Sequence, residues 1–436
     1  MHQSTRCTKV RDASQTQLLQ AGTRWYPSRC PCDFADEWHR FRRYASWMCQ
    51  LSYHPNFGVH IPPEVFRLVS LCLAEMVMCP RLRDVDLVAN SDILPFYRLF
   101  LSPKLAGFSL NYSSSLLEPP EEVLSIIQSM VMGLDAFPLQ HLRLLLGVPE
   151  EASRQIEPLV SSAVLRCGPA LEGLIISSPL SDAAVQHIMQ LPNLGMWDAV
   201  SGPPKTSHLP LSDIFPRLND LSLVSEASLE WLTFLTKTTR RILPGQNFHS
   251  PLDWGRIQRF RRLVVYPPVP IDSVFMTPIM QFRGLVLLRL KPACSHSGGC
   301  AFRLTDNNIA EITTALPRLE VAILGAACSA NSCRTTVASL VSFSTRCRHL
   351  KYLKVHFNMT NLRSGLESVS VDPRLDNLPS SRTRGNFHLS LLGAPYTISE
   401  DDVVPVLKGF RRIFPSLTEI EGEDDWGELS LMLQEV

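Results

Sequence analysis

Apolar residues recur along this chain in a short pattern whose first, fourth and sixth positions are leucine or another large apolar residue, as in Leu285, Leu288 and Leu290. Within each copy the apolar and polar positions alternate, which is typical of a strand buried on one face. Eleven copies begin at Leu82, Leu105, Leu139, Leu171, Leu194, Leu218, Phe260, Leu285, Leu319, Leu350 and Leu417. A further strand is expected from Phe387 to Leu391, and the segments then start 23 to 42 residues apart, which leaves room for one strand and one helix each.

Two other signals agree with this pattern. Seven of the twelve segments have a proline two residues before their first apolar residue, where 33 prolines in 436 residues would place about one. Proline cannot continue a helix, so each of these prolines is expected to end a helix and lead into a strand. Ser181, Thr305 and Ser399 stand in three copies of one phrase and are expected to cap the N-termini of helices.

The pattern predicts an α/β leucine-rich-repeat solenoid of about 11–12 irregular repeats. Its strands form a parallel sheet on a concave face, and its helices lie on the convex face. We expect residues 1–36 to be a poorly ordered leader and 37–436 to be the solenoid. A flexible insertion is expected near 360–385, because that stretch is rich in Ser, Asn and Arg, and a capping helix is expected at 426–436.

The strand alternation also predicts which residues line the concave face, because the polar positions between the inward leucines point outward. In the later strands these positions carry basic and aromatic residues, which suit an acidic or phosphorylated peptide. The alternative is that they are solvated charges grouped by chance. The predicted partner-binding residues are Arg262, Tyr266, Arg289, Lys291, Tyr352, Lys354 and His356.

Composition narrows the function classes. A formal net charge of +1 gives no overall attraction to nucleic acid or to a membrane surface. The longest apolar stretch, Val65 to Met78, contains Arg67 and Glu75 and is too short to span a bilayer. We therefore expect a protein of the cytoplasm or nucleus whose 12 cysteines are reduced, with neither nucleic acid nor membrane as a partner.

Catalytic motifs are not evident in the sequence, since it contains no phosphate-binding glycine loop, zinc-protease motif or serine-hydrolase elbow. We expect no enzyme activity and no cofactor. The best metal candidate is Cys294, His296 and Cys300, followed by Cys328 and Cys333. These spacings do not match a standard zinc frame, so plain structural thiols are the preferred interpretation and no metal site is predicted.

From about Asp36 onward the amino-acid sequence resembles the leucine-rich-repeat half of basidiomycete fungal F-box proteins. The phrases that carry the resemblance are Glu37–Ser46, Phe96–Leu105, Leu304–Ile309, Ala394–Asp402 and Phe410–Leu417. The resemblance implies a substrate receptor of a cullin–RING (SCF-type) ubiquitin ligase. In such a receptor, an F-box helix bundle docks on a Skp-type adaptor and the repeats hold the target.

The sequence departs from that family at the F-box itself. An F-box should precede Trp38, but residues 1–36 are short and polar. The phrase Ile61–Phe66 is similar to the start of an F-box, yet a repeat strand follows at Leu82 and leaves no room for the remaining helices. Two hypotheses stay open. Either the chain is a substrate receptor whose F-box lies upstream, where a Skp-type adaptor would bind, or it is a free-standing binding scaffold without ligase association.

Overall fold

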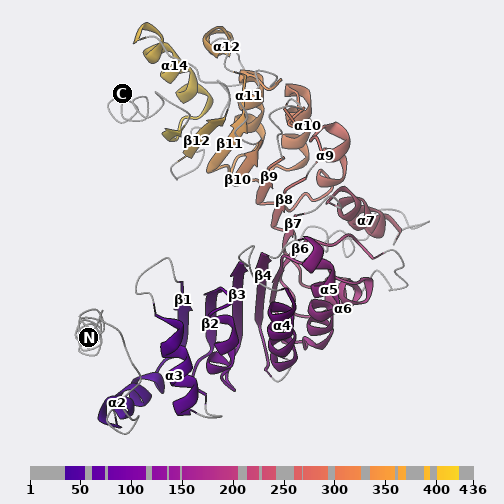
Figure 1. The fold of residues 1–436 in the computed structure, drawn as a ribbon. Coiled ribbons are helices and arrows are strands. Elements are labelled where there is room, and N and C mark those ends of the chain that lie inside the picture. The colour runs from indigo at the N-terminus through magenta and orange to yellow at the C-terminus, as the bar shows by residue number, and fades with distance from the viewer. Residues whose placement is uncertain are drawn as a thin grey trace.

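In the part of the chain that the structure describes, 13 parallel strands, β1 to β13, form one long sheet in which each strand lies beside the next strand in the sequence. This computed structural model describes residues 35–54, 61–73, 77–113, 120–134, 137–147, 150–204, 214–224, 228–241, 260–267, 269–292, 300–325, 334–358, 362–369, 387–392 and 400–421. In Figure 1 the strands line the inner side of an arc and the helices cover its outer side. The predicted α/β leucine-rich-repeat solenoid is therefore confirmed.

The strands are short, as expected for repeats that each contribute one strand to the sheet. They are β1 (Gln50–Tyr53), β2 (Asp84–Ala89), β3 (Gly107–Ser113), β4 (His141–Gly147), β5 (Gly173–Ile176), β6 (Met196–Ala199), β7 (Asp220–Leu223), β8 (Arg262–Val265), β9 (Leu287–Leu290), β10 (Val321–Leu324), β11 (Tyr352–His356), β12 (Phe387–Leu392) and β13 (Leu417–Glu421). All twelve segments predicted from the apolar pattern are strands.

The strands alternate with helical segments, most of which pack against their neighbours along the convex side. These are α2 (Ala35–Ala45), α3 (Pro63–Leu73), the 3-10 helix η2 (Leu94–Phe100), α4 (Pro120–Leu134), α5 (Glu150–Arg166), α6 (Asp182–Gln190), α7 (Ser228–Arg241), α9 (Ser273–Ile279), α10 (Asp306–Ala315), α11 (Val337–Arg346), α12 (Leu362–Val369) and α14 (Glu400–Ile413).

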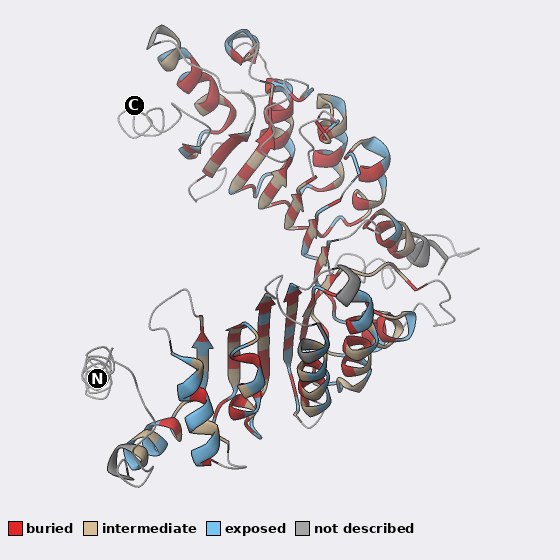
Figure 2. Ribbon diagram, viewed as in Figure 1, coloured by how far each residue is buried: buried red, intermediate tan, exposed pale blue. Residues whose placement is uncertain are grey.

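The core is a column of inward residues that runs from repeat to repeat. Leu263, Leu288, Ala322 and Leu353 occupy the same register position in consecutive strands, and the last three are fully buried. Figure 2 shows buried positions alternating with more exposed ones along the strands. This alternation explains why the period-two pattern predicts the fold, because each strand buries one face against the helices and leaves the other on the concave side.

The proline prediction is confirmed at the end of α6, and the capping prediction is confirmed at the starts of α6 and α10. Helix α6 ends at Gln190 and is followed by Leu191 in extended geometry immediately before Pro192. The Ser181 hydroxyl caps α6 by accepting a hydrogen bond from the Ala184 amide, and Thr305 forms a complete capping box with Asn308 at α10. Ser399 lies outside the described residues.

The first repeat begins earlier than the sequence pattern predicted. Strand β1 pairs with β2, and α3 lies between them along the chain. The side chain of Phe66 on α3 is buried against Tyr53 of β1, with the two ring centroids 5.6 Å apart. The F-box-like phrase Ile61–Phe66 therefore belongs to the helix of the first repeat, and its aromatic residue is part of the core.

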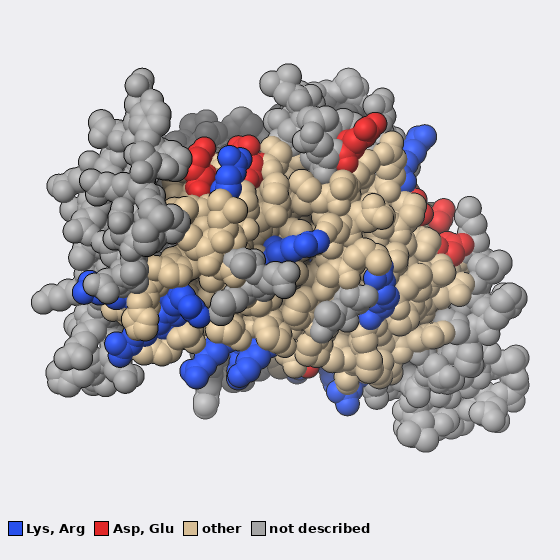
Figure 3. Space-filling view, turned by 60° about the horizontal axis from the view of Figure 1, so that its bottom comes forward, with Lys and Arg blue, Asp and Glu red and all other residues tan. Residues whose placement is uncertain are grey.

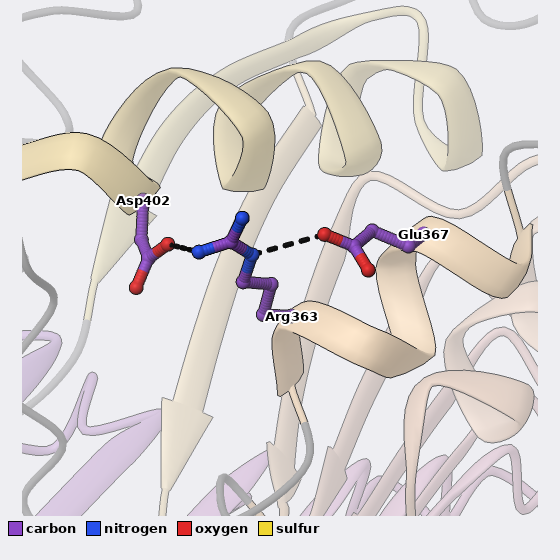
Figure 4. Close-up of polar contacts among 3 residues, drawn as sticks. All are labelled: Arg363, Glu367 and Asp402. Atoms are coloured by element: carbon purple, nitrogen blue, oxygen red, sulfur yellow. Dashed lines mark hydrogen bonds and ion pairs between the residues drawn. The ribbon is translucent and has the colours of Figure 1, made fainter.

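The segment 360–385, expected to be a flexible insertion, contains helix α12, which buries Leu362, Leu366 and Val369. The expectation rested on polar composition, whereas three apolar residues at helical spacing suffice to hold this helix on its neighbours. The rest of that segment lies outside the described residues, as do most of the predicted leader and the predicted capping helix at 426–436. Arg363 of α12 pairs with Glu367 at 2.9 Å and with Asp402 of α14, and the second pair links the two helices. Figure 4 shows the Arg363 guanidinium between the two carboxylates.

Candidate partner-binding surface

The outward side chains of the strands form continuous columns on the concave face, because every strand pairs in parallel with the next. One column passes through Val264, Arg289, Ile323 and Lys354 in β8 to β11. A second passes through Arg262, Leu287, Val321 and Tyr352 in the same strands. The surface of β8–β11, together with Tyr266 and Lys291 just beyond β8 and β9, is called the central patch below.

Three cations of the central patch are gathered on the concave side. Arg289, Lys291 and Lys354 are each half-buried. Among the described residues, no acidic side chain forms an ion pair with Arg289 or Lys291, and the Nε atom of Arg289 is buried without a hydrogen bond. Lys354 forms an ion pair with Glu421 of β13, in which the ammonium nitrogen and the carboxylate oxygen are 3.8 Å apart. The cluster therefore carries positive charge that the fold itself neutralises only in part.

The pKa of Lys291 also shows that positive charge is in excess at this place. Burial lowers the pKa of its ammonium group, and the positive charges of Arg289 and Lys354 lower that pKa further. The three groups therefore repel one another in a partly desolvated place, and an anion placed among them would relieve that repulsion.

Two tyrosines frame these cations. The Tyr266 side chain is 36% exposed, and the Arg289 guanidinium lies 6.0 Å from the centre of its ring. Tyr352 packs on His388 of β12 with the ring centroids 4.8 Å apart. Burial raises the pKa of the Tyr352 phenol, and the nearby carboxylate of Glu421 raises it further. At neutral pH this hydroxyl therefore keeps its proton and remains a hydrogen-bond donor.

An apolar floor lies among the charged residues, and the sequence prediction missed it. Val264, Leu287, Val321 and Ile323 occupy outward positions and are half-buried. In the register, Ile323 lies directly between Arg289 and Lys354. The signal was present in the sequence as aliphatic residues at the outward positions of three successive repeats, where polar residues are expected if water covers the sheet.

Acidic side chains bound the central patch on both sides. Arg262, at the β8 edge, pairs with Asp220 of β7 at 3.6 Å. At the other edge His388 lies 3.0 Å from Glu419, while Glu421 lies between His388 and Lys354. The structure therefore brings six of the seven predicted residues to one concave region, but Arg262 and Lys354 are partly neutralised there.

No protein-family model matches this chain, and no curated protein is similar to it in sequence. The shape and chemistry of the surface must therefore carry the functional inference.

Figure 3 shows one face of the molecule on which lysine and arginine side chains lie singly or in small groups among uncharged residues, without a broad field of one sign. This agrees with the net charge of +1 and leaves local clusters as the source of electrostatic recognition.

His356, the seventh predicted residue, does not lie on the open surface. Its side chain is fully buried, and its Nδ1 atom lies 3.3 Å from the Cys300 sulfur. Alternation fails here because His356 ends its strand and is covered by Cys300 and Phe302. Gly325, with a φ of +111°, lies beside it, and a Cβ at Gly325 would approach the His356 Cβ to 2.6 Å.

The remaining sequence candidates lie mostly outside what the structure describes. Four members of the metal candidate lie outside the described residues, namely Cys294, His296, Cys328 and Cys333. The expectation that they and Cys300 are structural thiols rather than zinc ligands therefore stays a prediction from the sequence. Within the described residues, no three histidine, cysteine or acidic side chains are grouped so as to hold a metal ion. In the same part of the chain, no helix is both long and apolar enough to cross a bilayer.

Proposed function

We propose that this chain is the target-binding half of a substrate receptor of a cullin–RING ubiquitin ligase, and that it acts in the cytoplasm or nucleus by binding rather than by catalysis. Its concave face holds the target protein. The proposal draws its ligase component from the resemblance to the repeat half of fungal F-box proteins. The observation that supports its binding component is the uninterrupted concave sheet with its half-buried charged and apolar side chains.

The concave face suits a protein partner because of its size and its mixed chemistry. Thirteen strands at a spacing of about 4.8 Å give an inner surface roughly 58 Å long. Arg289 and the two tyrosines occur beside aliphatic side chains on the central patch, and arginine and tyrosine are enriched at the centres of protein interfaces. A small-molecule site would instead be expected to enclose its ligand in a deep apolar pocket.

Association with a Skp-type adaptor is proposed only through an F-box that precedes the solenoid in the reading frame. The F-box-like phrase Ile61–Phe66 is a poor docking element, because Phe66 is 5% exposed and is committed to the core of the first repeat. The same observation favours the second hypothesis, a free-standing binding scaffold, if no F-box is joined to the repeats.

A photo-crosslinking amino acid can test both parts. It would replace Val264 on the concave face, and in a matched control Val274, which is 68% exposed at the start of helix α9. We expect a target protein to be crosslinked at position 264 only, to persist longer in cells when this chain is depleted, and to co-purify with the Skp-type adaptor when an upstream F-box is joined to the repeats. Crosslinking without any change in target lifetime or any adaptor would favour the free-standing scaffold. Crosslinking at position 274 alone would overturn the concave site.

A further inference from the structure

The cations of the central patch differ from ordinary surface charges. Lysines and arginines that serve solubility extend into water, where solvent screens their repulsion. Lys354 has 27% of its side chain exposed, and Arg289 and Lys291 are also half-buried. Holding like charges together in a partly desolvated place costs free energy, because repulsion strengthens as water is removed. A complementary anion would remove that cost and bind through charge-assisted hydrogen bonds.

The geometry fits a ligand with one or two closely spaced anionic groups. Arg289 and Lys354 are two strands apart in one column, which is about 9.6 Å at the backbone. Lys291 lies two residues beyond Arg289 on the same side, at about 6.6 Å along the strand direction. Long side chains from these three positions can converge on a single phosphoryl group or on a pair of carboxylates.

The surroundings select against a long polyanion. Ile323 lies between Arg289 and Lys354, so an occupant must place apolar atoms at the centre of the cluster. Asp220 bounds the patch at one side, and Glu419 and Glu421 bound it at the other. A nucleic-acid backbone carries a charge on every nucleotide and would meet these carboxylates, whereas a short acidic stretch of a protein would not.

From this arrangement we infer that the central patch binds a short acidic segment of a protein partner, in an extended conformation. The carboxylates or a phosphoryl group of that segment contact Arg289, Lys291 and Lys354, and its apolar side chains rest on Leu287, Val321 and Ile323. Tyr266 and Tyr352 close the sides of the site. The inference rests on the proposed function, since it names the class of segment by which the concave face holds a target.

Fluorescence anisotropy on the full chain tests the inference with defined probes. The first probe is a fluorescein-labelled peptide in which aspartate and leucine take turns at every second position, with serine between them, so that one side of the extended chain carries both. The second has serine in place of aspartate, the third has one phosphoserine among serines and leucines, and the fourth is single-stranded DNA of equal length. We expect the aspartate probe to bind, the serine probe not to bind, and added salt to weaken binding. The phosphoserine probe tells whether one phosphoryl group replaces several carboxylates.

Matched variants locate the site. The triple variant Arg289→Ser, Lys291→Ser and Lys354→Ser should weaken binding about a hundredfold, because each lost charge-assisted bond contributes roughly a factor of five where it is partly solvated and the three losses multiply. The control removes the same charge from exposed positions, as Lys104→Ser, Arg154→Ser and Lys408→Ser, and should leave binding unchanged. Ile323→Ser keeps every charge and should weaken the aspartate–leucine probe about tenfold.

Each outcome separates the two proposals. Equal losses in the two triple variants, or tighter binding of DNA than of the acidic peptide, would overturn the acidic-segment site. If the probe fails to bind while the crosslinker at Val264 still captures a target that this chain destabilises, the inference fails and the proposed function stands. If the probe binds at the patch but no target changes lifetime, the site stands and the ligase role fails.

Discussion

Two neighbouring leucines of strand β9 offer a direct test of the register. Leu288 is fully buried in the inward column, whereas Leu287 is half-buried on the concave face. Because side chains alternate along a strand, the same substitution at these adjacent positions should have very different effects. We expect Leu288→Ala to destabilise the repeats strongly and Leu287→Ala to destabilise them little.

The magnitude follows from burial and from the neighbours. Leu288 lies between Leu263 and Ala322 in the buried column, and Ala322 is too small to fill the space that a truncation would leave. Such substitutions cost about 2–5 kcal/mol, and poor collapse of the cavity places Leu288→Ala in the upper half of that range. Leu287 loses only part of a half-buried surface, so Leu287→Ala should cost about 1 kcal/mol.

Hydrogen exchange measured by mass spectrometry is the suitable assay, together with urea unfolding. A repeat array is stabilised by contacts between neighbours, so Leu288→Ala should reduce amide protection in β8, β9 and β10 while β2 to β4 change little. Losses of equal size for the two variants would refute the alternation. A larger loss for Leu287→Ala would show that β9 is shifted by one residue.

Three further predictions concern charge and thiols. Burial raises the pKa of three cysteine thiols, to about 11 for Cys79 and Cys167 and to about 12 for Cys347. Because these groups ionise near pH 9 when unfolded, they should favour unfolding as the pH rises above about 9. At about pH 8 Cys79 and Cys347, which are buried, should resist iodoacetamide when alkylation is followed by mass spectrometry, and rapid alkylation of both in the native chain would contradict their burial. Burial also raises the pKa of Asp198, so Asp198→Asn should stabilise the chain at pH 7 by less than about 1 kcal/mol, and that advantage should shrink in acid as the wild-type carboxyl takes up its proton. Arg363→Ala should cause a small fall in the urea midpoint that disappears at high salt, because the pairs with Glu367 and Asp402 lie near the surface, and a loss that persists in salt would argue against an electrostatic origin.

The sequence predicts the solenoid because its local signals repeat and agree. Leucine spacing, prolines before strands and hydroxyl caps each report a different physical requirement, and together they locate twelve of the strands. Strand β1 was missed although Met48, Leu51 and Tyr53 have the repeat spacing. Its methionine and tyrosine are poor matches to a leucine pattern, so burial by tertiary contacts, including the Tyr53–Phe66 ring pair, was needed to reveal the strand.

The binding surface was less predictable, because outward positions are defined by neighbours in space. Alternation placed Arg289 and Lys354 on the concave side, but the ion pair of Lys354 with Glu421 joins residues 67 positions apart and has no local signal. His356 shows the other limit. It continues the alternation by sequence, yet Cys300 and Phe302, which follow β9 rather than β11, cover it completely.

The spacing of the parallel strands also restricts the length of motif that the concave face can read. A ligand that crosses the strands meets a new row of side chains every 4.8 Å or so, whereas an extended peptide presents same-side residues about every 6.7 Å. Three strand spacings, about 14.4 Å, nearly equal two same-side repeats of the peptide, about 13.4 Å, so the two periods match again to within roughly 1 Å after three strands. The distance from β8 to β11 is three such steps, so an extended segment of about five residues would place its first and last side chains in register with the two edges of the central patch. Longer ligands would lose that match unless they bent, which makes a short linear motif the natural unit of recognition on this sheet.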